Sequence, residues 1–276
     1  MNNYGEQIDA AFKEKKLFFK PWVGRRYDDG ILFEGSSRPV KTLVIGASRY
    51  CRYSYEQEKR SKKLADTSIR ICRYVNECCN HCDYDTLIQF SDKCPFVSWL
   101  NKKTQSFHLS DFNSALIPGN KEEVYSSFKR AIVKVIDKQS LGGGLWAHVA
   151  FVNYYQGIVW GDKQDRKKTP TRDTPRGREQ YEQSEQVIVT VLEILQPDLI
   201  ILWTPKSFNT AAKDGLFRKC ESVVFERETT HRCNLTLNNH LIPLFLCPHP
   251  ARIVTSGMKE ELERFKEELR SFVKDY

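Results

Sequence analysis

Four short apolar runs along the chain contain no alternation of polar and apolar residues. They occupy residues 42–45, 149–152, 198–203 and 243–247, and each is bounded by polar or turn-forming residues. A strand with one face in solvent alternates, whereas a strand covered on both faces is apolar throughout. The four runs therefore predict buried strands of a largely parallel sheet.

Apolar side chains also recur at helical spacing near the N-terminus, between the predicted strands and at the C-terminus. These stripes consist of Ile8, Phe12 and Leu17; Val124, Phe128, Ala131 and Val135; Tyr181, Ser184, Ile188, Val191 and Leu195; and Met258, Leu262, Phe265, Leu269 and Phe272. We expect Thr255 or Ser256 to cap the last helix. Residues 222–239 predict an additional strand or a hairpin.

The alternation of strands and helices predicts an α/β fold with three layers, αβα, around a central, mostly parallel four-stranded sheet. The chain shows no internal repeat and no low-complexity linker. We therefore expect a single domain over residues 1–276, with a core at about 41–256 and an N-terminal helical extension at 1–40.

The composition, 40% hydrophobic and 28% charged, is that of a globular protein rather than a disordered one. No apolar run reaches the length of a membrane span, and residues 1–30 lack the apolar centre of a secretion signal. These features predict a cytoplasmic monomer without a membrane partner. The net charge of +8 favours a polyanionic partner, of which nucleic acid is the usual kind.

The chain has nine cysteines, an odd number that favours free thiols over a disulfide framework. Cys79 and Cys82 have the spacing of metal ligands, and Cys94 follows, so a zinc or iron–sulfur site is one interpretation of these cysteines. Burial offers the simpler explanation, because Cys72 and Cys79 fall on the apolar face of a predicted helix near residues 62–79. We expect no metal and no cofactor.

The segments that directly follow the four predicted strands are rich in chemically useful side chains. They read Gly-Ala-Ser-Arg-Tyr at 46–50, Asn-Tyr-Tyr-Gln at 153–156, Thr-Pro-Lys at 204–206 and Pro-His-Pro-Ala-Arg at 248–252. In open α/β sheets, ligands bind beyond the carboxyl ends of the strands. We therefore expect these four segments to converge on one edge of the sheet.

In this order, the segments resemble the motifs of the uracil-DNA glycosylase superfamily. The superfamily has a glycine-containing motif after its first strand, a strand that ends in a base-reading asparagine, a strand that often ends in Leu-Trp-Gly, and a His-Pro-Ser loop. The counterparts are residues 46–50, Phe-Val-Asn at 151–153, Ile-Leu-Trp at 201–203 and His-Pro-Ala at 249–251.

Two further segments are similar to those of an uncharacterised bacterial branch of the superfamily. They are Pro-Trp-Val-Gly at 21–24 and Phe-Val-Asn-Tyr at 151–154. The resemblance spans residues 41 to about 256, most of the chain. It implies a DNA-binding protein of this fold that hydrolyses the N-glycosidic bond of uracil or another modified base. The DNA can be single-stranded or modified.

The resemblance gives catalytic roles to His249 and Asn153. A histidine held between two prolines can stabilise the negative charge that develops on the departing base, although a loop histidine can also serve only the backbone. The Asn153 amide offers a donor and an acceptor together, which suits the edge of a base, although a strand-terminal asparagine can also simply form a turn.

The same resemblance places Gly46, Ala47, Ser48 and Tyr50 in the base pocket, where Tyr50 would form one wall. Phosphate contacts are expected from Arg49, from Arg252 just beyond His249, and from a basic segment at 162–178. Within that segment we expect Lys167, Lys168 and Arg172 to contact DNA. A solvated surface loop explains the same charges.

The sequence also departs from the superfamily pattern. Residues 46–50 contain no acid or amide to activate water, and Ala251 replaces the serine of the His-Pro-Ser loop. Asp162 and Asp165 are the nearest acids that follow Asn153. A non-catalytic nucleic-acid-binding module on the same fold therefore stays an alternative. An unrelated esterase-like hydrolase is a weaker one, because the chain lacks a Gly-x-Ser-x-Gly elbow.

Overall fold

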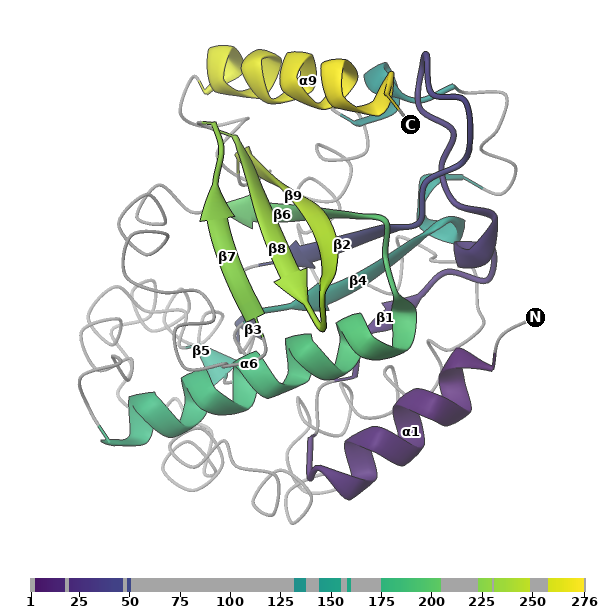
Figure 1. Cartoon of the computed structure of the whole chain (residues 1–276). Coiled ribbons are helices and arrows are strands. Elements are labelled where there is room, and N and C mark those ends of the chain that lie inside the picture. The colour runs from purple at the N-terminus through teal and green to yellow at the C-terminus, as the bar shows by residue number, and fades with distance from the viewer. Residues whose placement is uncertain are drawn as a thin grey trace, which may run out of the picture.

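The architecture is that of a computed structural model, whose helices and strands are shown in Figure 1. The structure describes residues 3–17, 20–46, 49–50, 132–137, 144–154, 158–159, 175–204, 223–229, 231–248 and 258–275.

A seven-stranded mixed sheet forms the centre of the molecule, with the strand order β1-β4-β2-β6-β9-β8-β7. Its strands are β1 (Trp22–Val23), β2 (Thr42–Gly46), β4 (Val149–Asn153), β6 (Leu199–Thr204), β7 (Val223–Arg227), β8 (Arg232–Leu237) and β9 (His240–Pro248). A separate two-stranded sheet pairs β3 (Arg49–Tyr50) with β5 (Ile158–Val159). The α/β class expected from the sequence is confirmed.

The four predicted strands are neighbours in this sheet and run parallel to one another. β2 pairs with β4 on one side and with β6 on the other, and β6 pairs in turn with β9. Residues 42–46 of β2 are all buried, as expected for a strand covered on both faces. The pattern of apolar runs thus identified the parallel centre of the sheet.

The expected count of four strands is too small, because β1, β8 and β7 extend the sheet by antiparallel pairing. β7 and β8 form the hairpin that residues 222–239 predicted, and β8 pairs with the first part of β9. β8 alternates buried and half-buried residues, which is the signature of a less covered strand rather than of a central one. β1 has only two residues, too few to show a period.

Helices cover both faces of the sheet, with α1 and α6 on one side and α9 on the other (Figure 1). Their bounds are α1 Tyr4–Glu14, α6 Pro175–Leu195 and α9 Lys259–Val273, and short 3₁₀ helices occupy η1 Tyr27–Asp29, η4 Val133–Val135 and η6 Leu145–Ala147. The sheet therefore separates two apolar clusters, and the helix layers on its two faces match the three-layer prediction.

The first cluster joins Phe12 of α1 and Ile188 of α6 to the side chains of Ile45 and Leu202 on the sheet. The second joins Phe265 of α9 to the opposite face, which includes Val44, Ile201 and Phe245. Neighbouring strand residues such as 44 and 45 enter different clusters because successive side chains of a strand point to opposite faces.

Two helix predictions need correction. Leu17 is buried as expected, but α1 ends at Glu14, so Leu17 packs from the segment beyond the helix. The last helix begins at Lys259 with Met258 as its N-cap and without a side-chain cap hydrogen bond, so neither Thr255 nor Ser256 caps it.

The expected helix at 124–135 is described only from residue 132, where a 3₁₀ turn follows. The helix near 62–79 lies outside the described residues. Among the helices that are described, none combines the length and the apolar character needed to traverse a bilayer.

Candidate functional site at the carboxyl edge of the sheet

The four parallel strands that precede the predicted motif segments end at a common edge of the sheet. In spatial order, β4, β2, β6 and β9 end at Asn153, Gly46, Thr204 and Pro248. Gly46 lies opposite Asn153 in the register, and Thr204 lies opposite Pro248. The expected convergence is therefore realised for the residues at which the strands end.

The chain beyond two of these strands stays together. β3 follows β2 after two residues, β5 follows β4 after four, and the two short strands pair in parallel with Arg49 opposite Ile158 and Tyr50 opposite Val159. The backbone at Arg49 and Tyr50 thus runs beside the segment that follows Asn153.

Gly46 gives the Asn153 side chain the space that it occupies. A Cβ atom at Gly46 would lie 2.5 Å from Asn153 Oδ1 and 2.7 Å from Phe151 Cζ, closer than a side chain tolerates. The Tyr154 backbone N–H donates a hydrogen bond to the Gly46 carbonyl oxygen at 2.8 Å. The amide of Asn153 therefore lies against Gly46 at the end of the neighbouring strand, and a larger residue there would require the side chains of Asn153 and Phe151 to shift.

Aromatic side chains support this edge from the α9 side of the sheet. The ring centroids of Phe151 and Trp203 are 5.2 Å apart at an interplanar angle of 52°. The series continues from Phe151 to Trp146 at 6.3 Å and from Trp146 to Trp22 at 6.1 Å, both edge to face. Aromatic pairs at these separations contribute stability beyond that of their buried area. The aromatic side chains on the α9 side of the sheet therefore pack firmly against the end of β4 that carries Asn153.

The Pro-Trp-Val-Gly segment at 21–24 belongs to this support rather than to the edge itself. Trp22 pairs with Phe151 across β1 and β4. A Cβ at Gly24 would lie 2.3 Å from the Ala147 carbonyl oxygen, and the Gly24 N–H donates to the Val149 carbonyl oxygen at 3.0 Å. Glycine is therefore required at position 24 for close backbone contact at the start of β4.

Tyr154 and Glu185 form a polar contact that sequence reasoning missed. Both residues are buried, and the Tyr154 hydroxyl donates a long hydrogen bond of 3.5 Å to Glu185 Oε1. The contact links the end of β4 to α6. Its only sequence signal was the polar residue Ser184 within the apolar stripe of that helix, which marks a polar patch on the buried face.

Most of the other predicted site residues lie outside the described residues. These are His249, Ala47, Ser48, Arg252, Lys167, Lys168 and Arg172. For Arg49 and Tyr50 the structure describes the backbone strand and not the side chains. Of the predicted catalytic and base-binding set, the structure brings Asn153 and Gly46 together, and β9 ends at the residue before His249.

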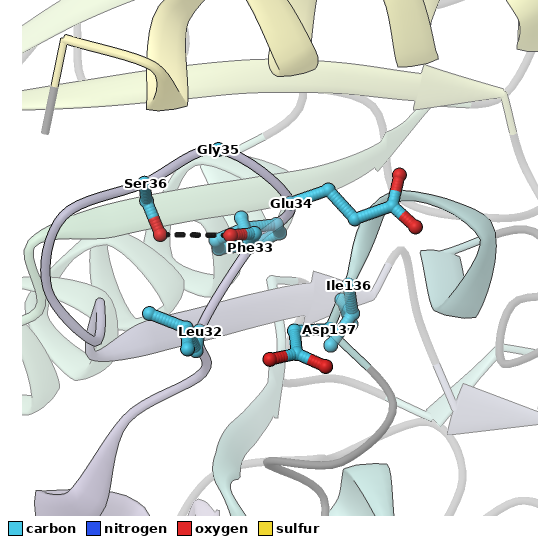
Figure 2. Close-up of a pocket in the computed structure, with 7 residues that line it drawn as sticks. All are labelled: Leu32, Phe33, Glu34, Gly35, Ser36, Ile136 and Asp137. Atoms are coloured by element: carbon cyan, nitrogen blue, oxygen red, sulfur yellow. Dashed lines mark hydrogen bonds between the residues drawn. The ribbon is translucent and has the colours of Figure 1, made fainter.

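A separate pocket of about 540 Å³ lies away from this edge. It is lined by residues 32–36 and by the pair Ile136 and Asp137 (Figure 2). Val40, which pairs with Ile31 beside this pocket, precedes the amino end of β2. The pocket therefore belongs to the end of the sheet opposite to Asn153 and Gly46.

No cluster of three or more histidine, cysteine or acidic side chains suited to a metal ion occurs within the described ranges. Cys79, Cys82 and Cys94, the cysteines with the spacing of metal ligands, lie outside those ranges. In comparisons with known proteins, no protein-family model matches the chain, and no curated protein matches it.

Proposed function

We propose that the protein is a DNA glycosylase of the uracil-DNA glycosylase type, which hydrolyses the N-glycosidic bond of uracil or another modified base in DNA. The observation that carries the proposal is the adjacency of Asn153 and Gly46 at the ends of parallel strands, on the edge that also receives the end of β9. The motif order gave the prediction, and the strand order supports it.

Asn153 is the proposed base-reading residue. Its side-chain amide can donate one hydrogen bond and accept another, which is the pairing that the edge of a pyrimidine or purine needs. The contact with Gly46 and the aromatic support beneath Phe151 favour this role, because recognition requires an amide held in one orientation.

His249, one residue beyond β9, is the proposed stabiliser of the departing base. In the reaction the bond between the sugar carbon and the base nitrogen breaks, and its electron pair leaves on the base. A water oxygen forms the new bond to the sugar carbon, and the proton released by the water neutralises the base. A hydrogen bond from a fixed imidazole to the base carbonyl stabilises the developing anion.

The residue that orients water differs from the superfamily pattern, because residues 46–50 contain no acid or amide. Asp162 and Asp165 are the proposed replacements. The proposed phosphate contacts are Arg49, Arg252, Lys167, Lys168 and Arg172. The net charge of +8 supports them, since binding to the DNA backbone is dominated by such cations.

Base release from end-labelled oligonucleotides tests the proposal. Single- and double-stranded substrates would carry uracil, hypoxanthine, xanthine or a modified cytosine, and alkali would reveal each abasic site. We expect release of at least one base, lost in Asn153→Ala and His249→Ala. Asn234→Ala on β8 and His240→Ala at the opposite end of β9 are matched controls that should retain activity.

A second candidate is a non-catalytic nucleic-acid-binding module, favoured by the absence of an acid or amide at residues 46–50. It predicts binding that weakens steeply with salt, because cations on the protein displace counterions from the phosphates. Binding of this kind without release of any of the tested bases would favour the module over the enzyme.

A further inference from the structure

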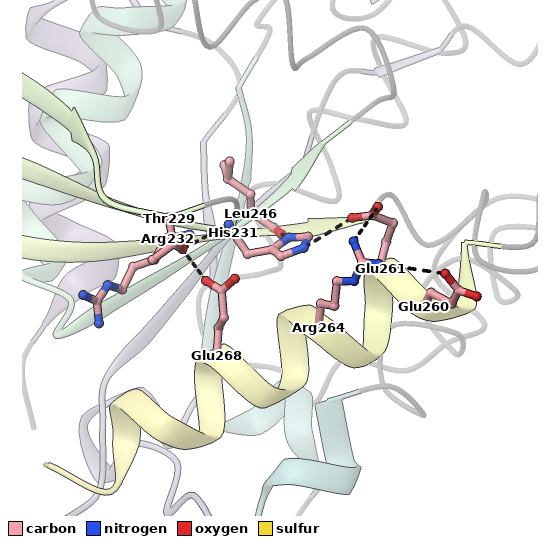
Figure 3. Close-up of polar contacts among 8 residues, drawn as sticks. All are labelled: Thr229, His231, Arg232, Leu246, Glu260, Glu261, Arg264 and Glu268. Carbon is pink, nitrogen blue, oxygen red and sulfur yellow. Dashed lines mark hydrogen bonds and ion pairs between the residues drawn. The ribbon is translucent and has the colours of Figure 1, made fainter.

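Polar contacts connect the helices to the sheet on both of its faces. On one face, Glu268 of α9 accepts a hydrogen bond from the Thr229 hydroxyl, in the segment between β7 and β8 (Figure 3). On the opposite face, the hydrogen bond from Tyr154 to Glu185 connects α6 to the end of β4. Only the second of these two contacts lies next to a residue of the candidate site, because Tyr154 directly follows Asn153.

Tyr154 is held at three points. Its backbone N–H donates to the Gly46 carbonyl oxygen at 2.8 Å, its ring packs in the first apolar cluster, and its hydroxyl donates to Glu185 Oε1 at 3.5 Å. The preceding side chain, that of Asn153, instead approaches Gly46 together with the Phe151 ring of the second cluster. Successive side chains of a strand point to opposite faces. A firmly held Tyr154 therefore limits the movement of the backbone that carries the Asn153 amide.

Glu185 is an acid on the buried face of α6. Its exposed fraction is 5%, and Val187 and Ile188 of the same helix belong to the first apolar cluster. Burial of a carboxylate costs free energy that its hydrogen bonds must offset, and an apolar side chain of similar size would avoid that cost. Stability alone therefore gives no reason for an acid at this position. A fixed acceptor for the Tyr154 hydroxyl does give one.

We propose that Tyr154 and Glu185 are positioning residues, whose hydrogen bond anchors the end of β4 to α6 and so holds the Asn153 amide beside Gly46. The effect of this anchor on base release rests on the proposed function, whereas the anchor itself does not. A displacement of a reacting or binding group by about 1 Å can lower a rate about a hundredfold. Residues behind the Asn153 amide can therefore set the rate through the place that they give it.

Hydrogen exchange of the Tyr154 amide in the full-length protein tests the anchor. The test variant is Tyr154→Phe/Glu185→Met, because replacing both partners by apolar groups of similar shape leaves the overall stability nearly unchanged. We expect the protection of the Tyr154 amide to fall about twofold to tenfold, as for the loss of one hydrogen bond. The amide of Leu202, within β6, should keep its protection. The matched control is Tyr27→Phe, which removes a buried hydroxyl that donates to the Leu195 carbonyl oxygen of α6 at 3.4 Å.

The kinetics of base release test the link between the anchor and the site. In the double variant we expect kcat to fall about tenfold to a hundredfold. KM should stay as in the wild type, because phosphate contacts dominate the affinity for DNA. Glu185→Gln keeps a side-chain oxygen that can accept the tyrosine hydroxyl, so it should keep both the wild-type kcat and the wild-type protection. Tyr27→Phe should keep them as well.

Equal protection of the Tyr154 amide in the wild type and in the double variant would overturn the anchor. An equal fall at Tyr154 and Leu202 would overturn it too, because it indicates a general loss of stability. If the wild type releases no base, the glycosylase proposal fails, while the exchange result still decides whether the anchor exists. If the wild type releases a base and the double variant is equally fast, the link between the anchor and Asn153 is wrong.

Discussion

At the scale of single residues, the site depends on the pairing of a glycine with an asparagine. The apolar runs predicted Gly46 and Asn153 at the ends of buried strands, and the resemblance gave both residues their expected roles. It gave no sign that one makes room for the other, since that requires the register of β2 against β4. Glu185 was missed for the same reason, because its partner Tyr154 comes from another element.

The substitution Gly46→Ala tests the pairing. The new methyl group would displace the Asn153 amide, so we expect a loss of unfolding free energy of about 1–3 kcal/mol together with a loss of base release. Chemical denaturation measures the first and the oligonucleotide assay the second. If the clash is with Asn153, the destabilisation in the double variant Gly46→Ala/Asn153→Ala should be smaller than the sum of the single effects. Simple additivity would argue against the contact.

A second residue-scale prediction concerns Lys266, a buried lysine on α9. Its ammonium donates a hydrogen bond of 2.6 Å to Glu263 and thereby lowers the pKa of that carboxyl group, while desolvation opposes the shift. A carboxylate whose pKa is lower in the folded state stabilises the fold above its unfolded pKa of about 4.3. That stabilisation is lost as the pH falls through the folded value.

We therefore expect Lys266→Met to flatten the dependence of stability on pH below about 4.3. At pH 7 the substitution should leave the stability unchanged or raise it. Removing the buried ammonium also removes its desolvation penalty, which offsets the lost ion pair. Urea unfolding between pH 3 and pH 7 measures both effects. The control is Lys259→Met, at an exposed position of the same helix. If the loss of stability at acid pH is unchanged in Lys266→Met, the hydrogen bond from Lys266 to Glu263 does not cause it.

At the scale of elements, the apolar patterns were sufficient to predict the strands and helices that bury a continuous face. The four central strands and the stripe Leu262, Phe265 and Leu269 of α9 follow the predicted periods. Where an element is short or half-covered, pattern gave less: β1 has two residues, and the start of α9 has no capping side chain.

Truncation of the α9 stripe measures how firmly that helix holds the second apolar cluster. Phe265 is fully buried against the sheet, so Phe265→Ala should lower the unfolding free energy by about 3–5 kcal/mol through lost burial and a cavity. Phe272, at the margin of the same cluster and only partly buried, is the matched position, and Phe272→Ala should cost less. Equal losses at the two positions would show that α9 is not anchored as described.

At the scale of the whole molecule, function depends on the order in which strands lie side by side. The sequence presented the motifs in the order β2, β4, β6, β9, whereas the sheet arranges them as β4-β2-β6-β9. That permutation makes Asn153 a neighbour of Gly46, and no local pattern could have revealed it. The sequence predicted the antiparallel extension through β8 and β7 only as a strand or hairpin at residues 222–239, without its place at the sheet edge.

The central claim, that this edge removes a base from DNA, has one direct test. A uracil-containing oligonucleotide is incubated with the wild type and with Asn153→Ala in parallel, and the intact mass of the DNA is read by mass spectrometry. We expect the mass of an abasic strand with the wild type and unchanged DNA with the variant. If uracil is not the substrate, another modified base should show the same contrast. Intact DNA throughout the base panel, or release that does not depend on Asn153, would contradict the claim.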